Sequence, residues 1–236
     1  MSEQPEDKVA ELPARRRKHG EAYYVVGGPV QPRRGCYIER TADQQLLDKL
    51  REGDYCNVMA PRQTGKSSLV ARTAMRLRQE GFGTAVVDLS QSVSRNADSE
   101  AGRWYYGIAY RIVRDLRLTV DLQHWWQEKK PLSPLQRLNE FFWEIVLANT
   151  RSPIVIFLDS LDVAESLEFA VDLFMAVRAC YDARAAEPDY ERLRFVLLGT
   201  VLPGDGKASP RHTLYDIGRR IELQDFTFQQ ARPLCR

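Results

Sequence analysis

The sequence predicts an α/β fold of three layers, in which helices flank both faces of a parallel, five-stranded sheet. Three observations support this. Short apolar runs alternate with longer amphipathic segments, the apolar runs are nearly continuous, and one of them leads directly into a glycine-containing loop and a helix. Continuous apolar runs are typical of strands that are covered on both faces. The 236 residues, of which 44% are hydrophobic, can bury the core of one such domain.

Five apolar runs are assigned as strands. In chain order they are YCNVMA (55–60), TAVVDLS (84–90), PIVIFLD (153–159), RFVLLGT (194–200) and RRIELQDF (219–226). Segments with apolar residues at helical spacing occur at 66–79, around 104–116, at 135–148 and at 169–185. The large aromatic residues of these helices are expected to pack in the core or against neighbouring helices rather than to stack on bases. They are Trp104, Tyr105, Phe141, Phe142, Trp143 and Phe174.

The composition and the chain ends bound the classes of function. Residues 1–20 are charged and show no apolar period, so we expect a flexible leader before a domain over residues 21–236. With 34 basic and 32 acidic side chains, the net charge of +2 creates no general attraction for nucleic acid or an anionic membrane. We therefore expect neither nucleic acid nor a membrane as a partner, unless a local basic patch binds one of them. The scattered cysteines and histidines signal no zinc site or disulfide framework, and we expect a cytoplasmic protein.

The stretch APRQTGKSS, from Ala60 to Ser68, follows the first predicted strand and opens a helix. A strand, a tight loop and a helix together point several backbone N–H groups into one concavity, which suits a phosphate. Gly65 lets the backbone curl close to the phosphate oxygens, Lys66 reaches the β and γ oxygens, and the Ser67 hydroxyl can complete a Mg²⁺ shell. The usual first glycine of this P-loop (Walker A) pattern is Ala60 here. The candidate phosphate-binding residues are Pro61, Arg62, Gln63, Thr64, Gly65, Lys66, Ser67 and Ser68.

The strand PIVIFLD ends in Asp159, which should stand at the carboxyl edge of the sheet beside the phosphate loop. In P-loop NTPases an acid there (Walker B) helps to hold Mg²⁺, although Asp159 could instead cap the next helix. Hydrolysis also needs a group that orients water, commonly a glutamate directly after the aspartate. This chain has Ser160 there, and Asp162 is the nearest alternative carboxylate.

Together these motifs resemble the AAA-like domain family, which is placed with the STAND class of signalling P-loop ATPases within the AAA+ group. The resemblance covers about residues 23–234. It rests on CYIERTADQQLLDKL, YCNVMAPRQTGKSSLVART, IVIFLDSLD, LFMAVRACYDARAAEPDYERLRFVLLGT and YDIGRRIELQDFT. It implies an adenine nucleotide and a five-stranded sheet in which one further strand separates the phosphate-loop strand from the strand of Asp159.

The resemblance also suggests roles for residues outside the two motifs. Tyr37, Ile38 and Arg40 would contact the base and ribose, and Glu39 would either join them or cap the next helix. Thr200 would sense the γ-phosphate. Either Arg219 or Arg220 could be an arginine finger that completes a neighbour's site in a homo-oligomer formed on nucleotide binding, or both could be plain surface charges.

Two departures from the family pattern shape the functional expectation. Ser160 replaces the usual glutamate, which leaves open whether ATP is hydrolysed, and the chain stops where family members continue into a helical lid. We expect an ATP/ADP- and Mg²⁺-dependent switch in bacterial signal transduction or defence, with slow hydrolysis and a partner or effector protein that reads its state. One alternative is a catalytically inactive ATP-binding scaffold. Another is a DNA-associated AAA+ ATPase.

Overall fold

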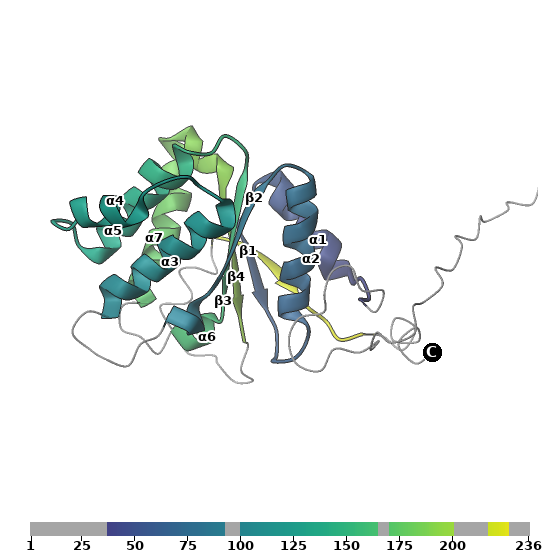
Figure 1. The fold of residues 1–236 in the computed structure, drawn as a ribbon. Helices are drawn as coiled ribbons and strands as arrows, with labels where there is room; N and C mark the ends of the chain where they lie inside the picture. The colour runs from purple at the N-terminus through teal and green to yellow at the C-terminus, as the bar shows by residue number, and fades with distance from the viewer. Residues whose placement is uncertain (1–36, 93–99, 165–169, 201–216, 227–236) are drawn as a thin grey trace, which may run out of the picture.

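A computed structural model describes residues 37–92, 100–164, 170–200 and 217–226. Its sheet contains five parallel strands in the order β2-β3-β4-β1-β5 (Figure 1). The strands are β1 (Cys56–Met59), β2 (Gly83–Asp88), β3 (Ile154–Asp159), β4 (Leu193–Gly199) and β5 (Arg219–Glu222). The predicted α/β class and the strand inserted between β1 and β3 are therefore confirmed. The expected leader over residues 1–20 lies outside the described residues.

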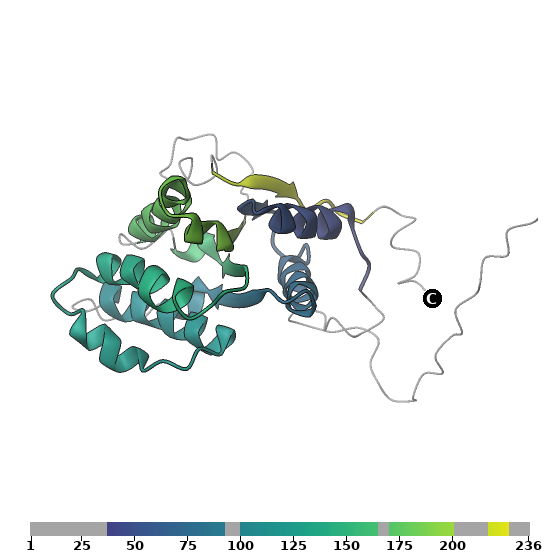
Figure 2. The same cartoon turned by 90° about the horizontal axis from the view of Figure 1, so that it is seen from above.

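Helices cover both faces of the sheet, as Figures 1 and 2 show. One face carries α1 (Thr41–Glu52) and α2 (Lys66–Gln79). The other carries α3 (Glu100–Leu116), α4 (Leu122–Glu128), α5 (Pro134–Glu140) and α7 (Ala170–Asp182), while the short α6 (Leu161–Ala164) follows β3. None of the helices in the described segments is long and apolar enough to cross a membrane.

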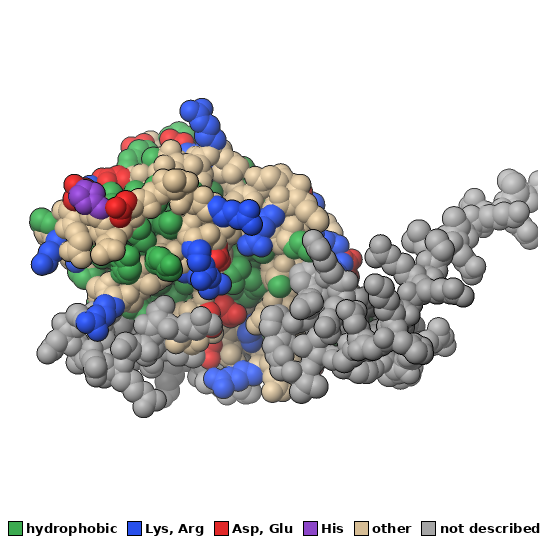
Figure 3. Space-filling view, viewed as in Figure 1, with side chains coloured by type: hydrophobic (Ala, Val, Ile, Leu, Met, Phe, Trp, Pro, Cys, Tyr) green, Lys and Arg blue, Asp and Glu red, His purple; other side chains and the backbone are tan. Residues whose placement is uncertain are grey.

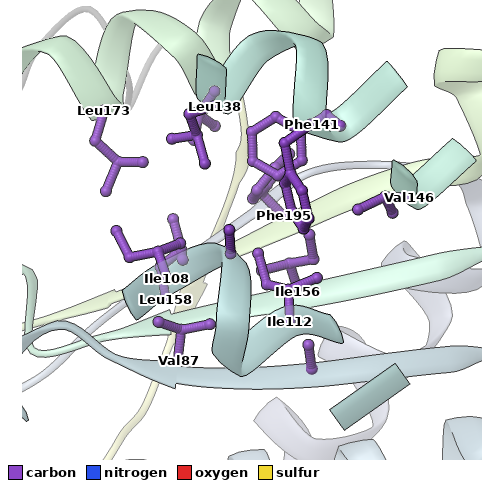
Figure 4. Packing of buried hydrophobic residues seen from close by; sticks show 14 of the residues in the cluster. Val87, Ile108, Ile112, Leu138, Phe141, Val146, Ile156, Leu158, Leu173 and Phe195 are labelled. Atoms are coloured by element: carbon purple, nitrogen blue, oxygen red, sulfur yellow. The ribbon is translucent and has the colours of Figure 1, made fainter. Parts of the chain in front are cut away.

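Alternate residues of the central strands point to opposite faces of the sheet. In β3, Ile154, Ile156 and Leu158 pack under α3, α5 and α7, whereas Val155 and Phe157 pack under α1 and α2. Side chains of successive strand residues point to opposite faces, so a strand buried on both sides must be apolar at every position. This explains the continuous apolar runs of the sequence. Figure 4 shows the larger of the two clusters, where Ile156 and Leu158 meet Ile108, Phe141 and Phe195.

The segment predicted as one helix over 135–148 consists of two parts. Ser133 caps α5 by accepting a hydrogen bond from the Gln136 N–H (3.2 Å), and a π-helix, η3 (Phe141–Leu147), continues it. Because a π-helix closes i→i+5 hydrogen bonds, its wider turn lets Phe141 and Phe142 share a buried face with Ile145–Leu147.

Trp143 falls on the opposite side of this wider turn. Its side chain is 38% exposed and stacks on Tyr190, with ring centroids 5.6 Å apart. Trp143 thus packs against a neighbouring segment at the surface and not in the core, whereas the other five aromatic residues of that set are buried. Helix α4, which the sequence interpretation did not assign, begins where the Asp121 carboxylate accepts the His124 N–H at 3.0 Å.

Candidate functional site

The carboxyl ends of the parallel strands meet at one edge of the sheet, the lower edge in Figure 1. Ligands of open α/β sheets bind at this edge. The loop after β1 runs into α2 here, Asp159 closes β3, and Thr200 follows β4. The topology thus brings the two main motifs of the sequence to the same edge, although about a hundred residues separate them.

The loop from Ala60 to Gly65 is held in a curled conformation. Gln63 and Gly65 have positive φ angles of 64° and 92°, and the Thr64 hydroxyl donates to the Pro61 carbonyl oxygen at 2.8 Å. Helix α2 begins at once, since the Leu69 N–H donates to the Gly65 carbonyl at 3.0 Å. A side chain added at Gly65 would meet the Arg40 guanidinium at 3.1 Å, so both the φ angle and the space favour glycine there.

The Lys66 ammonium lies over this loop. Its Nζ donates to the carbonyl oxygens of Ala60 (2.7 Å) and Pro61 (2.9 Å). Burial lowers the pKa of Lys66, while the nearby carboxylates of Asp159 and Asp162 act in the opposite direction. These two carbonyl contacts are ones that an arriving anion can replace, because an ammonium has three donors and binds phosphate oxygens more strongly than neutral carbonyls.

Asp159 is half-buried across the edge from Lys66. Burial raises the pKa of its carboxyl group. The Ser160 N–H, which donates to Asp159 Oδ1 at 2.8 Å, and the charge of Lys66 lower it in part. This hydrogen bond from Ser160 is not the contact of a helix cap, which would come from the second or third helical residue. An ionised Asp159 and the exposed Ser67 hydroxyl offer the oxygen ligands that Mg²⁺ prefers, so the residues present fit this metal.

The residue after Asp159 turns the chain sharply. Ser160 has a φ of 65°, in the left-handed region, and α6 starts at the next residue. Asp162, the alternative carboxylate, faces the phosphate loop and pairs with Arg62 at 3.4 Å. Because the Arg62 side chain is 78% exposed, solvent screens this pair strongly.

Arg40 braces the phosphate loop. Its side chain is buried, its Nη1 donates to the Thr64 carbonyl oxygen at 2.7 Å, and its guanidinium lies 5.0 Å from the centre of the Phe226 ring. Its backbone N–H donates to the Asp43 carboxylate at 2.9 Å, which fixes the start of α1. The segment before α1, the phosphate loop and the segment after β5 are thereby joined through one side chain.

The other predicted contacts of the base lie beside α1 and α2. The Tyr37 hydroxyl donates to Asp43, the Arg72 guanidinium lies 4.7 Å from the Tyr37 ring centre, and burial raises the pKa of Tyr37. Glu39 pairs with Arg72 and Arg76 of α2. Ile38 is half-buried in the same segment. These contacts anchor the segment to the two helices, and contact with a nucleotide base stays a prediction.

The remaining candidates fall in two places. Thr200 stands half-buried at the site edge, directly after β4, and Ser68 is buried in the first turn of α2. Arg219 and Arg220 begin β5, and their partners in the sheet are Cys56 and Asn57 at the start of β1.

Both arginines therefore stand toward the end of the sheet opposite the phosphate loop. Arg219 pairs with Asp54 at 3.1 Å, and Arg220 lies 3.5 Å from Glu222. Neither belongs to the site of its own chain, so a finger role concerns only a neighbouring molecule and stays a prediction.

The structure adds one carboxylate that the sequence interpretation missed. Asp88 ends β2 directly beside Asp159 in the register of the two strands. Its Oδ1 accepts hydrogen bonds from the Ser90 N–H (3.0 Å) and hydroxyl (2.6 Å) at the start of the 3-10 helix η1 (Leu89–Ser92). The signal was present in the sequence, because VVD ends an apolar run with an aspartate just as IFLD does.

The fold and this edge define a domain of the P-loop NTPase class: a parallel sheet of order β2-β3-β4-β1-β5, a phosphate loop after β1 and an acid at the end of β3. The AAA-like domain family matches residues 25–236, and the chain belongs to that family. An uncharacterised WD repeat-containing protein of Synechocystis sp. is 39% identical over 215 residues. That match covers 89% of this chain and 18% of the relative, so the chain spans less than a fifth of the relative's length.

Solved structures of similar fold include two ORC proteins and a Walker-type ATPase. The ORC1 protein of Aeropyrum pernix in complex with DNA has a TM-score of 0.56 and 17% identity, over 84% of this chain and 48% of that one. A Walker-type ATPase of Pyrococcus abyssi has a TM-score of 0.54 and 14% identity, over 86% and 58%. The ADP form of the Aeropyrum pernix ORC2 protein has a TM-score of 0.54 and 17% identity, over 89% and 53%. These likenesses establish the fold.

Proposed function

We propose that this domain binds ATP with Mg²⁺ at the loop Ala60–Ser68 and acts as a nucleotide-dependent switch of the STAND type in signal transduction. The observation that carries the proposal is the placement of Lys66, whose ammonium lies over a curled loop that opens a helix, with Asp159 across the edge. An anion at this point gains a helix N-terminus, backbone N–H groups and a lysine together. The ADP form of the similar Aeropyrum pernix ORC2 protein supports an adenine nucleotide as the ligand.

Each residue of the site would have a separate part. Lys66 would exchange its contacts with Ala60 and Pro61 for phosphate oxygens, and Ser67 with Asp159 would hold Mg²⁺, which neutralises charge on the phosphates when bound. Arg40 would transmit a movement of the loop to its neighbours. A shift of Thr64 would move the Arg40 guanidinium, which also contacts Phe226, and the Arg40 backbone is bound to the start of α1. This coupling gives the two nucleotide states different conformations for a partner to read.

The partner belongs to the proposal as well. The relative from Synechocystis is named as a WD repeat-containing protein, and WD repeats form β-propellers. We therefore infer that the nucleotide state of this domain is read by a separate effector or repeat region. Ser160 in place of the usual glutamate favours slow hydrolysis, as a timed switch requires.

The first experiment follows the fate of bound ATP. Protein loaded with labelled Mg·ATP and freed of excess nucleotide should convert it to bound ADP slowly, over minutes to an hour. The Ser160→Glu variant should bind ATP equally well and convert it faster. ATP that stays intact in both proteins would favour the inactive scaffold, whereas failure to retain any nucleotide would remove the proposed function. A conversion rate that rises with protein concentration would favour an arginine finger from a second molecule.

A second candidate, a DNA-associated ATPase, is favoured by one surface feature. A groove of about 1060 Å³ lies between α2 and α3 along the edge strand β2, and its lining includes Arg78, Arg111, Arg114 and Arg117 beside the single carboxylate Asp115. In Figure 3, Lys and Arg side chains gather at the centre of this face. Such a local patch could bind phosphates despite the net charge of +2, and the similar ORC1 structure is a DNA complex.

Salt dependence of binding tests this candidate. If the groove binds DNA, the logarithm of the duplex affinity should fall steeply with the logarithm of salt concentration, and each phosphate contact contributes about 0.9 to the slope. The double variant Arg111→Gln, Arg114→Gln should reduce the slope by about two contacts, whereas Lys130→Gln, at the α4–α5 turn, should not. Absence of measurable binding at 50 mM salt would contradict the candidate.

A further inference from the structure

Two carboxylates stand side by side at the nucleotide edge. Asp88 and Asp159 are directly paired in the register of β2 and β3, and both are the last residues of their strands. Neighbouring strands lie about 4.8 Å apart, so the two side chains reach into the same space beyond the sheet. The charge of Asp88 is also one of the causes that raise the pKa of Asp159. The loops that follow adjoin as well, because η1 packs against both α6 and β3.

Asp159 lies between Lys66 and Asp88. The charges of Lys66 and of Asp88 both act on its carboxyl group, and the sheet order places β2 on the far side of β3 from the phosphate loop. If Lys66 marks the phosphates, Asp88 therefore stands beyond Asp159, on the outer side of the position that the γ-phosphate would take. A water attacking in line with the leaving group must approach from outside the phosphate chain.

Neither of the sequence candidates is well placed to hold that water. Ser160 has its backbone in the left-handed region and its N–H turned back to Asp159, and a hydroxyl is a poor acceptor for a water proton at neutral pH. Asp162 faces the other way, toward Arg62 on the phosphate loop, and its charge acts on Lys66. Among the described residues at this edge of the sheet, Asp88 is a further carboxylate that lies next to Asp159.

We propose that Asp88 is the carboxylate that orients the attacking water, in the part that a glutamate after Asp159 would otherwise play. The inference rests on the proposed function, since the site is defined by the phosphate loop. Asp88 accepts a hydrogen bond from the water, whose oxygen forms a bond to the γ-phosphorus as the bond from that phosphorus to the β–γ bridging oxygen breaks. ADP leaves, both protons of the water end on inorganic phosphate, and Asp88 returns unchanged.

A purely structural role of Asp88 would lead to different experimental results. Asp88 Oδ1 accepts two hydrogen bonds from Ser90, so it could serve only to start η1. Asp88→Asn keeps an acceptor oxygen for that turn and removes the carboxylate charge. Ser90→Ala does the reverse, because it removes the hydroxyl contact of 2.6 Å and leaves the carboxylate in place. The two variants therefore separate the turn from the water-binding group.

The experiment measures Mg·ATP affinity and single-turnover hydrolysis on the full chain. Asp88→Asn should bind Mg·ATP within about threefold of the unaltered protein and hydrolyse it at least about 100-fold more slowly. Ser90→Ala should change both by less than about threefold. Adding Ser160→Glu to Asp88→Asn should restore at least a tenth of the lost rate, a rescue that a structural role of Asp88 does not allow.

Several results would overturn the inference. They are an Asp88→Asn protein that hydrolyses ATP at an undiminished rate, one that loses nucleotide affinity as much as turnover, and a Ser90→Ala protein that is equally impaired. A protein that binds Mg·ATP but never hydrolyses it would also overturn the part assigned to Asp88, while it would leave nucleotide binding intact. A protein that binds no nucleotide would instead refute the proposed function itself.

Discussion

Replacing Lys66 with alanine should weaken Mg·ATP binding by at least about 100-fold, the largest single effect that we expect in this protein. The ammonium lies on the phosphate loop and can replace two carbonyl contacts by charge-assisted hydrogen bonds to phosphate. Hydrogen bonds that involve a charged group contribute about 1.5–3 kcal/mol each, so the loss of two corresponds to a change of this size. Titration calorimetry with Mg·ATP measures the effect directly.

The matched control for this variant is Lys130→Ala. Lys130 is exposed at the turn between α4 and α5, far from the phosphate loop in the chain, and its loss should leave the affinity unchanged. The fold should tolerate Lys66→Ala, because burial already disfavours the charged form of this lysine. An unchanged affinity in a Lys66→Ala protein of normal thermal stability would contradict the assignment of the loop.

Replacing Asp159 with asparagine should have two opposite effects. Affinity for ATP in the presence of Mg²⁺ should fall roughly 10- to 100-fold, as is usual when groups that support a metal are lost. The nucleotide-free protein should become more stable at neutral pH, because burial raises the pKa of Asp159 and the folded state therefore disfavours its ionised form. Such an exchange of stability for function is common at active sites.

The pH dependence of this stability gain has a definite sign. A carboxyl group whose pKa is raised by folding costs stability above both of its pKa values, and the cost disappears once both states are protonated. The advantage of Asp159→Asn should therefore be greatest at pH 7 to 8. It should vanish as the pH falls through the folded pKa and below about 4, the ordinary value for the unfolded chain.

Thermal unfolding of the nucleotide-free proteins between pH 8 and pH 4 measures this dependence. Asp172→Asn, on the exposed side of α7, serves as the control for the loss of a surface carboxylate. A gain of equal size at every pH would exclude the charge as its cause, and a loss of stability at pH 7 would show that hydrogen bonding to the Asp159 carboxylate outweighs its burial.

The elements that the sequence predicted well have local physical causes. Helix α2 occupies Lys66–Gln79, as its apolar spacing indicates, and the strands β1 to β4 lie within two residues of the predicted runs, because continuous apolar residues suit strands covered on both faces. The motifs of the site, Lys66 in its loop and Asp159 at its strand end, likewise follow from residues that are contiguous in the chain.

The features that the sequence did not predict depend on interactions that no local sequence pattern shows. The segment predicted as one helix over 135–148 contains a π-helix at Phe141–Leu147, and the Trp143 side chain within it is 38% exposed. The strand predicted over 219–226 ends at Glu222, because pairing with β1 stops where β1 itself gives way to the phosphate loop.

The sequence by itself determined the fold class, the order of the strands along the chain and the loop that would hold phosphate, since each depends on periodicity or on neighbouring residues. Only the tertiary structure decided which side chains share the nucleotide edge. Asp88 and Asp159 are 71 positions apart in the chain, and their pairing depends on the register of two parallel strands joined by α3, α4 and α5. Register is fixed by the packing of both faces of the sheet at once.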